Sequence, residues 1–453
     1  MKIGIVGWGL EGQSAFNFYG PEHEYLIVNE EPRDDFPPES DKIKVQFLPG
    51  QREPGLTGNV ADLSYLDGLK ACDKIIYTGP AAKNLEKAFK DDPDFWAKAT
   101  TIQHIFFEEV KTKNIIGVTG TKGKGTTSTL IYELLKAAGK KVFLGGNIGI
   151  PVLDLVREIQ PDDWVVLELS NFQLYNLTYS PHIAVCLMII PEHLDWHPGF
   201  DDYLEAKANI FRHQKSDDIA IYFAGNENSE RLAGNSPGHK IPYFAAPGAR
   251  VREDGMIVIG ENEQEIISKT EVKLLGEHNL QNICAALTAI SEAVGSLDNA
   301  ETVLSSFSGL EHRLELVREL GGVKYYDDSF ATTPDSVMVA LHALVQPVVL
   351  ILGGHDKGLD YTELVDEIAM RERVRQVIAI GKIGPRLAEM LRGKHFTNIT
   401  EGLETMPQIV AEARAKAQAG DAVLLSTGTS SFGMFKDYKD RGNQFKAAVQ
   451  ALA

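Results

Sequence analysis

The chain has 453 residues, of which 43% are hydrophobic, and a formal net charge of −18. This length predicts about three domains, and the apolar content excludes a disordered chain. The acidic balance argues against non-specific binding to nucleic acid or to anionic membranes.

The cysteines and the N-terminus indicate where such a chain works. Cys72, Cys186 and Cys284 lie far apart and show no metal-ligand spacing, which fits a reducing compartment. The sequence MKIGIVGWG enters a strand at once and shows no signal peptide. No apolar run approaches the ~20 residues of a membrane span. We therefore expect a cytoplasmic protein without a membrane partner. We also expect it to act as a monomer.

Short apolar runs alternate with amphipathic segments along the whole chain. This alternation predicts parallel sheets of the α/β class. The expected domains are residues 1–100, 101–308 and 309–453. The expected strands lie within residues 2–9, 24–31, 73–79, 114–120, 141–147, 163–170, 182–190, 347–354, 374–381 and 422–428, and the clearest helices within 127–140, 205–214 and 282–295.

The first strand leads into a G-x-G-x-x-G turn made by Gly7, Gly9 and Gly12. Such a turn lets a diphosphate approach a helix N-terminus closely. An NAD site would favour an acidic residue at the end of the second strand, where Asn29 stands with Glu30 beside it. The motif alone leaves NAD binding, another nucleotide diphosphate and a merely tight turn open.

A second glycine-rich loop, GTKGKGTT at residues 120–127, is a stronger signal. Its backbone N–H groups can hold phosphate oxygens, and Lys124 supplies the positive charge that a transferring phosphoryl group needs. This predicts ATP or GTP binding, with an ordinary glycine turn as the alternative. A P-loop usually has Ser or Thr directly after its last lysine, but here Gly125 follows Lys124. Thr126 or Thr127 can replace the missing magnesium ligand.

Polar residues follow two other apolar runs of the same predicted sheet. Glu168 ends one run, and His193 and Asp195 follow the next. In open α/β sheets ligands bind beyond the carboxyl ends of the strands, so these groups are candidates for a metal site. Taken singly, a strand-end Glu is usually a solvated loop residue and a lone His a structural one. Magnesium also prefers oxygen ligands to histidine.

Eight motifs, in order along the chain, resemble the Mur ligases of peptidoglycan precursor synthesis, and most of all the branch that adds glutamate. They are GTKGKGTT (120–127), GGNIG (145–149), LELSNFQL (167–174), PEHLDWH (191–197), YLEAKANIF (203–211), GEHNLQN (276–282), GLEHRLE (309–315) and FKDYKDRGNQF (435–445). The resemblance implies an N-terminal Rossmann-like domain for a UDP substrate, a central P-loop ATPase-like domain and a C-terminal Rossmann-like domain for the amino acid.

The resemblance also implies a reaction. The carboxylate of UDP-N-acetylmuramoyl-L-alanine takes the γ-phosphoryl group of ATP, and the amine of glutamate attacks the resulting acyl phosphate. Two anions must meet in the first step, so cationic screening by Lys124 and by two Mg²⁺ ions is required. D-glutamate is favoured, with L-glutamate as the alternative.

Site residues carried over from the family fall into four groups. Those matching ATP contacts are Gly120, Thr121, Lys122, Gly123, Lys124, Gly125, Thr126, Thr127, Asn279, Asn282, Arg313 and Asp328, the last two reaching ATP when the third domain closes. Those matching UDP-substrate contacts are Gly9, Leu10, Asn29, Thr78, Gly79, Asn147, Ser170 and Gln173. Thr332, Ser431 and Tyr438 match glutamate contacts. Thr126, Glu168, His193 and Lys207 match metal ligands, with Lys207 as a carbamate.

Several of these residues also have ordinary explanations. A helical Lys such as Lys207 is usually a solvated surface charge, and Asn279 and Asn282 can be helix-capping residues. Lys122 stands where many relatives carry Asn, and the residues at 78–81 depart from the family's usual turn.

One departure from the family bears on the amino acid. Relatives that add D-glutamate typically carry Lys where this chain has Phe330. Loss of a charge-assisted hydrogen bond to a carboxylate costs about 1.5–3 kcal/mol unless another donor replaces it.

The whole chain has three rival interpretations. A folylpolyglutamate-synthetase-like ligase has no need of a nucleotide-diphosphate domain, and an NAD-dependent oxidoreductase leaves residues 117–127 unexplained. The third rival is a non-catalytic nucleotide-binding module.

Overall fold

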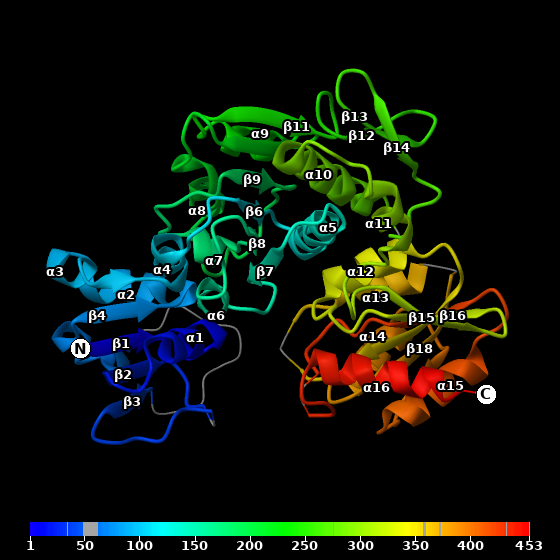
Figure 1. Ribbon diagram of the computed structural model, residues 1–453. Helices are drawn as coiled ribbons and strands as arrows, with labels where there is room; N and C mark the ends of the chain where they lie inside the picture. The colour runs from blue at the N-terminus through cyan, green and yellow to red at the C-terminus, as the bar shows by residue number, and fades with distance from the viewer. Residues whose placement is uncertain are drawn as a thin grey trace. The chain divides into compact units, whose positions relative to one another are not determined.

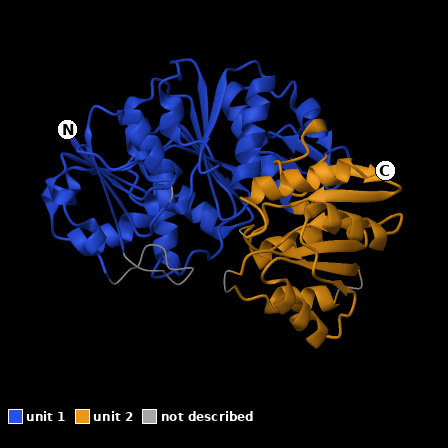
Figure 2. Ribbon diagram, turned by 90° about the horizontal axis from the view of Figure 1, so that it is seen from below, with its two compact units in different colours: residues 1–272, 278–305 blue, residues 273–277, 306–453 orange. Residues whose placement is uncertain are grey.

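The computed structural model describes residues 1–33, 35–48, 62–274, 276–356, 359–370, 373–431 and 433–452. Its contacts divide the chain into two compact units (Figure 2). Unit 1 contains residues 1–272 and 278–305, and unit 2 contains residues 273–277 and 306–453. The α/β class with parallel sheets is confirmed in both units (Figure 1). None of the helices in the described ranges has the length and apolar character needed to cross a membrane.

The N-terminal sheet of unit 1 has the strand order β3-β2-β1-β4-β5, and every adjacent pair in it is parallel. Its strands are β1 (Lys2–Val6), β2 (Glu24–Asn29), β3 (Ile43–Phe47), β4 (Lys74–Tyr77) and β5 (Ala99–Thr100). Its helices are α1 (Leu10–Tyr19), α2 (Ala82–Phe89), α3 (Pro93–Trp96) and α4 (Ile102–Glu109), with 3₁₀ turns η1 (Ser64–Leu66), η2 (Leu69–Ala71) and η3 (Gly79–Ala81). The inner strands β1, β2 and β4 are largely buried because helices cover both faces, which explains their continuous apolar runs.

The second sheet of unit 1 has the order β11-β10-β9-β6-β8-β7 and is also parallel. Its strands are β6 (Ile115–Thr119), β7 (Val142–Gly146), β8 (Trp164–Glu168), β9 (Ile183–Cys186), β10 (Ile219–Phe223) and β11 (His239–Tyr243). The helices are α5 (Lys124–Ala137), α6 (Val152–Val156), α7 (Asn171–Leu174), α8 (Phe200–Arg212), α9 (Glu227–Ala233), α10 (Glu277–Val294) and α11 (Ala300–Ser306). A small antiparallel sheet, β12 (Arg250–Val251), β13 (Met256–Ile259) and β14 (Gln264–Ser268), follows β11.

The position of β6 determines where the site can form. This strand pairs with β8 on one side and β9 on the other. The carboxyl ends of the three parallel strands therefore meet at one edge of the sheet, which is where open α/β sheets bind ligands. Glu168 is the last residue of β8, and the segments that follow β6 and β9 carry the glycine-rich loop and His193.

One hydrophobic core joins the two large sheets of unit 1. Ile5 of β1, Phe106 of α4, Val152 of α6 and Leu167 of β8 belong to the same buried cluster. Helix α6 packs against both α1 and α4. The N-terminal turn and the middle sheet are thus held in fixed positions within one unit, and a cavity can form between them.

Unit 2 contains a sheet of order β15-β16-β20-β17-β18-β19. Its strands are β15 (Glu315–Leu320), β16 (Val323–Asp327), β17 (Val348–Gly353), β18 (Val374–Ile380), β19 (Ile399–Thr400) and β20 (Ala422–Leu425). Among the described strands of this sheet, only the β15–β16 pair is antiparallel. Its helices are α12 (Pro334–Ala343), α13 (Thr362–Met370), α14 (Gly384–Gly393), α15 (Met406–Lys416) and α16 (Tyr438–Gln450), and two hydrophobic clusters flank the sheet.

Candidate active site

The glycine-rich loop follows β6 and continues into the first turn of α5, which begins at Lys124. Gly120 has φ 154° and Gly123 has φ 87°, backbone conformations that side-chain-bearing residues rarely adopt. A Cβ atom at Gly120 would lie 2.6 Å from the Cβ of Leu187, and one at Gly123 would lie 2.3 Å from Oδ1 of Asn282. The loop therefore has no room for side chains at these two positions, which is the geometry that brings backbone N–H groups close to a bound phosphate.

Two lysines converge on this loop. Lys124 Nζ donates to the carbonyl oxygens of Gly120 and Thr121 at 3.0 and 3.1 Å. Lys207 Nζ, from α8, donates to the same Gly120 oxygen at 2.9 Å and to Thr119 Oγ1 at 3.3 Å. Lys207 is only 1% exposed. Burial lowers its pKa well below the usual value, and the charge of Lys124 lowers it further.

The loop hydroxyls differ in what they do. Thr121 Oγ1 donates to the carbonyl of Ile190 at 3.0 Å and lies 3.0 Å from the Tyr203 hydroxyl, so it ties the loop to the segment after β9. Thr126 is 5% exposed in the first turn of α5. Thr127 Oγ1 is buried and has no hydrogen-bond partner within the described ranges. Thr126 and Thr127 therefore both stay the predicted replacements for the magnesium ligand that Gly125 cannot supply.

A salt bridge joins the glycine-rich loop to the segment after β9. Lys122 Nζ lies 2.5 Å from Glu192 Oε1. Glu192 belongs to the segment after β9, next to His193. Burial, the largest single effect, raises the pKa of Glu192, but the hydrogen bond to Lys122 and the positive charges around it together lower the pKa below its usual value. Residue 122, which departs from the family pattern, therefore has a local partner that the motif did not reveal.

Glu168 and Asn147 are brought together at the ends of β8 and β7. Asn147 Nδ2 donates to Glu168 Oε1 at 2.7 Å, and the Asn147 backbone N–H donates to the Glu168 carbonyl at 2.9 Å. Glu168 is 6% exposed, which excludes the solvated-loop interpretation. Ser170 and Gln173 form a capping box on α7, in which each side chain bonds the other's backbone N–H.

His193 is a half-exposed residue with an unusual backbone. Its φ is 57°, in the left-handed region. Its ring lies 5.0 Å from the Phe172 ring, and its Nε2 lies 3.9 Å from Glu192 Oε2. Burial lowers the pKa of His193, which favours the neutral imidazole that can ligate a metal. Glu168, His193 and Thr126 together offer one carboxylate, one imidazole and one hydroxyl, and their role as Mg²⁺ ligands stays a prediction.

A cavity of about 450 Å³ lies between the N-terminal turn and the middle sheet, inside unit 1. Seven of the eight residues that the resemblance assigns to the UDP substrate line it. They are Gly9, Leu10, Asn29, Thr78, Asn147, Ser170 and Gln173. Gly79 is not among the lining residues; its Cα packs against the Phe172 backbone, where a Cβ would lie 2.3 Å from the carbonyl oxygen. The roles of the seven lining residues and of Gly79 in substrate binding stay predictions.

The asparagines expected at adenine lie near the loop. Asn282 Nδ2 donates to Asn279 Oδ1 at 2.8 Å, and Asn282 is 6% exposed in α10. Because Asn282 Oδ1 occupies the space beside Gly123, this helix is directly coupled to the phosphate loop. The contact with adenine itself stays a prediction.

In unit 2, Asp328 lies in a buried hydrogen-bonded position. Its Oδ1 accepts from the Leu314 backbone N–H at 3.1 Å and its Oδ2 from Ser426 Oγ at 2.7 Å. Burial raises the pKa of Asp328 to about 7, although both hydrogen bonds act in the opposite direction. The carboxyl can therefore change its protonation state near neutral pH.

Phe330 joins Arg313 and Tyr438 at the surface of unit 2. The Arg313 guanidinium lies 5.3 Å from the centre of the Phe330 ring, and the Tyr438 ring meets it edge-on at 5.1 Å. Phe330 is 45% exposed. Of the other predicted glutamate contacts, Ser431 is buried and Thr332 is half-buried. A cation is thus present beside the position where relatives carry Lys.

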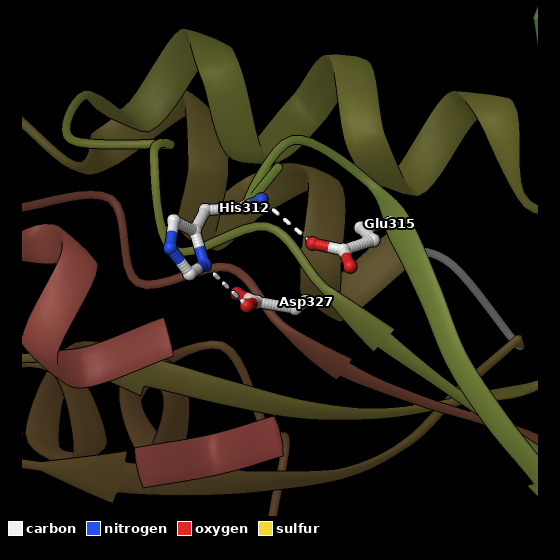
Figure 3. Close-up of side chains that lie close together, drawn as sticks. All are labelled: His312, Glu315 and Asp327. Carbon is white, nitrogen blue, oxygen red and sulfur yellow. Dashed lines mark hydrogen bonds and ion pairs between the residues drawn. The ribbon is translucent and has the colours of Figure 1, made fainter. Parts of the chain in front are cut away.

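Sequence reasoning missed a buried cluster next to these residues (Figure 3). His312 Nδ1 lies 2.7 Å from Asp327 Oδ2, and the His312 backbone N–H donates to Glu315 at 2.9 Å. Glu315 also accepts from Lys446, so the candidate ligands of this group are already engaged within the protein. His312 and Asp327 directly precede Arg313 and Asp328 in the sequence. This adjacency is the only feature of the sequence that points to the cluster.

Comparison with known proteins identifies the family. The Mur ligase middle domain matches residues 118–290, and the Mur ligase glutamate ligase domain matches residues 312–428. UDP-N-acetylmuramoylalanine–D-glutamate ligase of Acetivibrio thermocellus is 38% identical over 400 residues, covering 86% of this chain and 84% of the relative. The ligase of the same name from Clostridium acetobutylicum is 33% identical over 465 residues, covering 100% of this chain and 96% of the relative.

A solved structure agrees on the fold. The MurF ligase of Thermotoga maritima in complex with ADP superposes with a TM-score of 0.57 at 16% identity, covering 100% of this chain and 95% of that one. At this identity the likeness shows the three-domain architecture and not the activity. Together with the curated relatives and the two matched domains, it establishes that the chain belongs to the Mur ligase family.

Proposed function

We propose that the chain is an ATP-dependent ligase that joins D-glutamate to the alanyl carboxylate of UDP-N-acetylmuramoyl-L-alanine, with release of ADP and phosphate. Relatives with this activity in their name match the chain over 86% to 100% of its length. The observation that carries the proposal is the arrangement in unit 1, where a phosphate loop with two converging lysines lies beside Glu168, and Asn147 links Glu168 to the 450 Å³ cavity.

The first chemical step brings two anions together. The substrate carboxylate attacks the γ-phosphorus of ATP, and ADP leaves as the acyl phosphate forms. Lys124 neutralises charge on the transferring group, and the loop N–H groups orient it. Thr126, Glu168, His193 and a carbamylated Lys207 would hold Mg²⁺, which screens the phosphate charge when bound. The amine of glutamate then attacks the acyl carbon, and inorganic phosphate leaves as the amide bond forms.

Carbamylation of Lys207 is supported by its environment. A lysine reacts with CO₂ as the neutral amine, losing a proton as the N–C bond forms, and burial lowers the pKa of Lys207. As an ammonium, Lys207 would place a second positive charge beside Lys124 on the Gly120 carbonyl. As a carbamate it becomes an anion at the same place, which both removes that repulsion and supplies oxygen ligands.

Glutamate is proposed to bind in unit 2 through Thr332, Ser431 and Tyr438. Phe330 cannot pair with a carboxylate, but Arg313 lies over its ring and supplies positive charge beside it. The favoured stereoisomer is D-glutamate, because the curated relatives that match most of the chain carry this amino acid in their names. Addition of L-glutamate is the alternative, because this chain does not have a Lys at position 330.

Further assignments belong to the same proposal. Residues 1–100 bind the UDP portion, residues 101–308 bind ATP through Asn279, Asn282 and the loop, and residues 309–453 bind the amino acid. Arg313 and Asp328 act on ATP during turnover. The enzyme works in the cytoplasm as a monomer.

The test is a product assay with purified protein, ATP, Mg²⁺ and UDP-N-acetylmuramoyl-L-alanine. D-glutamate and L-glutamate are offered separately, phosphate release is followed, and the product is identified by mass and by chirality. We expect phosphate release that requires both substrates and a D-glutamyl product. ATP hydrolysis that needs neither substrate would contradict a ligase, and an L-glutamyl product would reverse the stereochemical assignment.

A further inference from the structure

Glu11 occupies a position that is electrostatically unfavourable for the proposed substrate. It lies in the first turn of α1, between Gly9 and Gly12 of the glycine turn, and lines the 450 Å³ cavity. Helix N-termini with such turns bind diphosphates through backbone N–H groups. An ionised carboxylate at this place would repel the anion that the turn is built to hold.

The hydrogen bonds of Glu11 are unevenly divided between its two oxygens. Gln173 Nε2 donates to Oε1 at 2.7 Å, and Gln103 Nε2 donates to the same Oε1 at 2.6 Å. The orientation of Gln173 is fixed, because its own Oε1 accepts from the Ser170 backbone N–H at 3.0 Å. Among the described residues, none bonds to Oε2 of Glu11. This pattern suits a neutral carboxylic acid, with Oε1 as the carbonyl and Oε2 bearing the proton.

The charged groups around Glu11 are engaged elsewhere or add negative charge. Burial raises the pKa of Glu11, and the two amide hydrogen bonds oppose that shift without cancelling it. No charged neighbour contributes to the shift. Asp154 of α6 accepts a hydrogen bond from Ser14, and Asp35 is paired with Arg33. Glu30 and Glu31, which also line the cavity, carry negative charge.

We propose that Glu11 binds the diphosphate of the nucleotide substrate as a neutral acid, with Oε2–H donating a hydrogen bond to a phosphate oxygen. The inference rests on the proposed function and names one residue of its substrate site. An arriving anion favours the protonated form further, so binding takes up a proton wherever free Glu11 is ionised. Affinity for the nucleotide substrate therefore falls as the pH rises above the pKa of free Glu11, by up to tenfold per pH unit.

The test is calorimetric titration of the full chain with UDP-N-acetylmuramoyl-L-alanine between pH about 5 and about 9, a span that starts above the ordinary glutamate pKa of about 4.3. The diphosphate of this ligand is a diester and keeps its charge throughout that span. Measurement in buffers of different ionisation enthalpy gives the number of protons taken up on binding. We expect uptake that grows toward one proton per site as the pH rises, together with the falling affinity.

Two variants separate this role from a structural one. Glu11→Gln stays neutral at every pH and keeps an N–H donor, so it should bind without proton uptake and with affinity that does not change with pH. Glu31→Gln removes an exposed charge from the same cavity and should keep the wild-type uptake. Proton release, or equal uptake by wild type and Glu11→Gln, would overturn the proposal for Glu11. Absence of binding to wild type at every pH would instead contradict the proposed function.

Discussion

Lys124 and Lys207 donate hydrogen bonds to one shared acceptor, the carbonyl oxygen of Gly120, at 3.0 and 2.9 Å. Lys124 lies within the phosphate loop and begins α5, and Lys207 comes from α8. Two ammonium groups on one carbonyl repel each other, and burial of Lys207 adds a desolvation cost. The arrangement is therefore poised for Lys207 to become neutral or to be converted into an anion.

Lys207→Ala should lose activity and regain part of it when acetate or another short carboxylate is added. The added carboxylate occupies the space of the carbamate and restores an anionic oxygen ligand. The measurement is phosphate release with and without the carboxylate, and Lys207→Arg, which fills the space with a cation, is the matched variant without rescue. Full activity of Lys207→Ala without any carboxylate would remove the carbamate from the account.

Gly123→Ala should raise the KM for ATP at least tenfold while leaving binding of the nucleotide-sugar substrate intact. The new Cβ would meet Asn282 Oδ1 and force the loop out of shape. The matched control is Gly139→Ala, because Gly139 also has a positive φ, 73°, but nothing lies within 4 Å of its Cβ position. That control should lose about 1–2 kcal/mol of stability from backbone strain and keep its KM for ATP. Equal KM values for both variants would mean that the loop does not hold the nucleotide.

Phe330→Leu should raise the KM for glutamate by about twofold to fivefold, and the KM for the UDP substrate should not change. Leu keeps the apolar bulk but removes the ring beneath the Arg313 guanidinium, a contact worth about 0.5–1 kcal/mol at an exposed site. Phe330→Tyr retains the ring and should behave as wild type. Steady-state kinetics with D- and L-glutamate provide the comparison, and an unchanged KM in Phe330→Leu would show that Arg313 needs no support from this ring.

Asp328→Asn should flatten the dependence of stability on pH between about 4 and about 7. The unfolded carboxyl titrates near its ordinary value of about 3.9, whereas burial raises the folded pKa to about 7. The folded state thus holds a proton that the unfolded state has released, so the stability conferred by this group is lost as the pH rises through that window. The loss is on the order of a few kcal/mol, since each pKa unit corresponds to about 1.4 kcal/mol. Parallel profiles of Tm against pH for the two proteins would contradict the buried acid.

Ten of the strands and the phosphate loop could be predicted because their signals are local, whereas others, such as β10 and β16, were not among the expected strands. Gly120 and Gly123 lie at the positions where the backbone needs positive φ, and β6, β8 and β9 are continuous apolar runs. Such patterns follow from the residues in one stretch of chain, and no tertiary contact is needed to recognise them.

The contacts that complete the site could not be predicted in the same way. Glu11 and Gln173 are 162 positions apart, and Lys122 and Glu192 are 70 positions apart. Nothing in either short segment specifies its partner, because the pairing depends on how α1, α7 and the segment after β9 pack. The burial of Lys207 also escaped prediction from composition alone, since a helical lysine is usually solvated and only the packing of α8 against the sheet encloses it.

The most direct test of the central claim follows the oxygen that the substrate carboxylate gives to phosphate. UDP-N-acetylmuramoyl-L-alanine is prepared with ¹⁸O in its alanyl carboxylate and turned over with ATP and D-glutamate, and the released phosphate is analysed by mass spectrometry. If an acyl phosphate forms at the loop of residues 120–127, one labelled oxygen appears in the phosphate, and Lys124→Ala releases none. Unlabelled phosphate alongside amide product, or wild-type release by Lys124→Ala, would contradict the account.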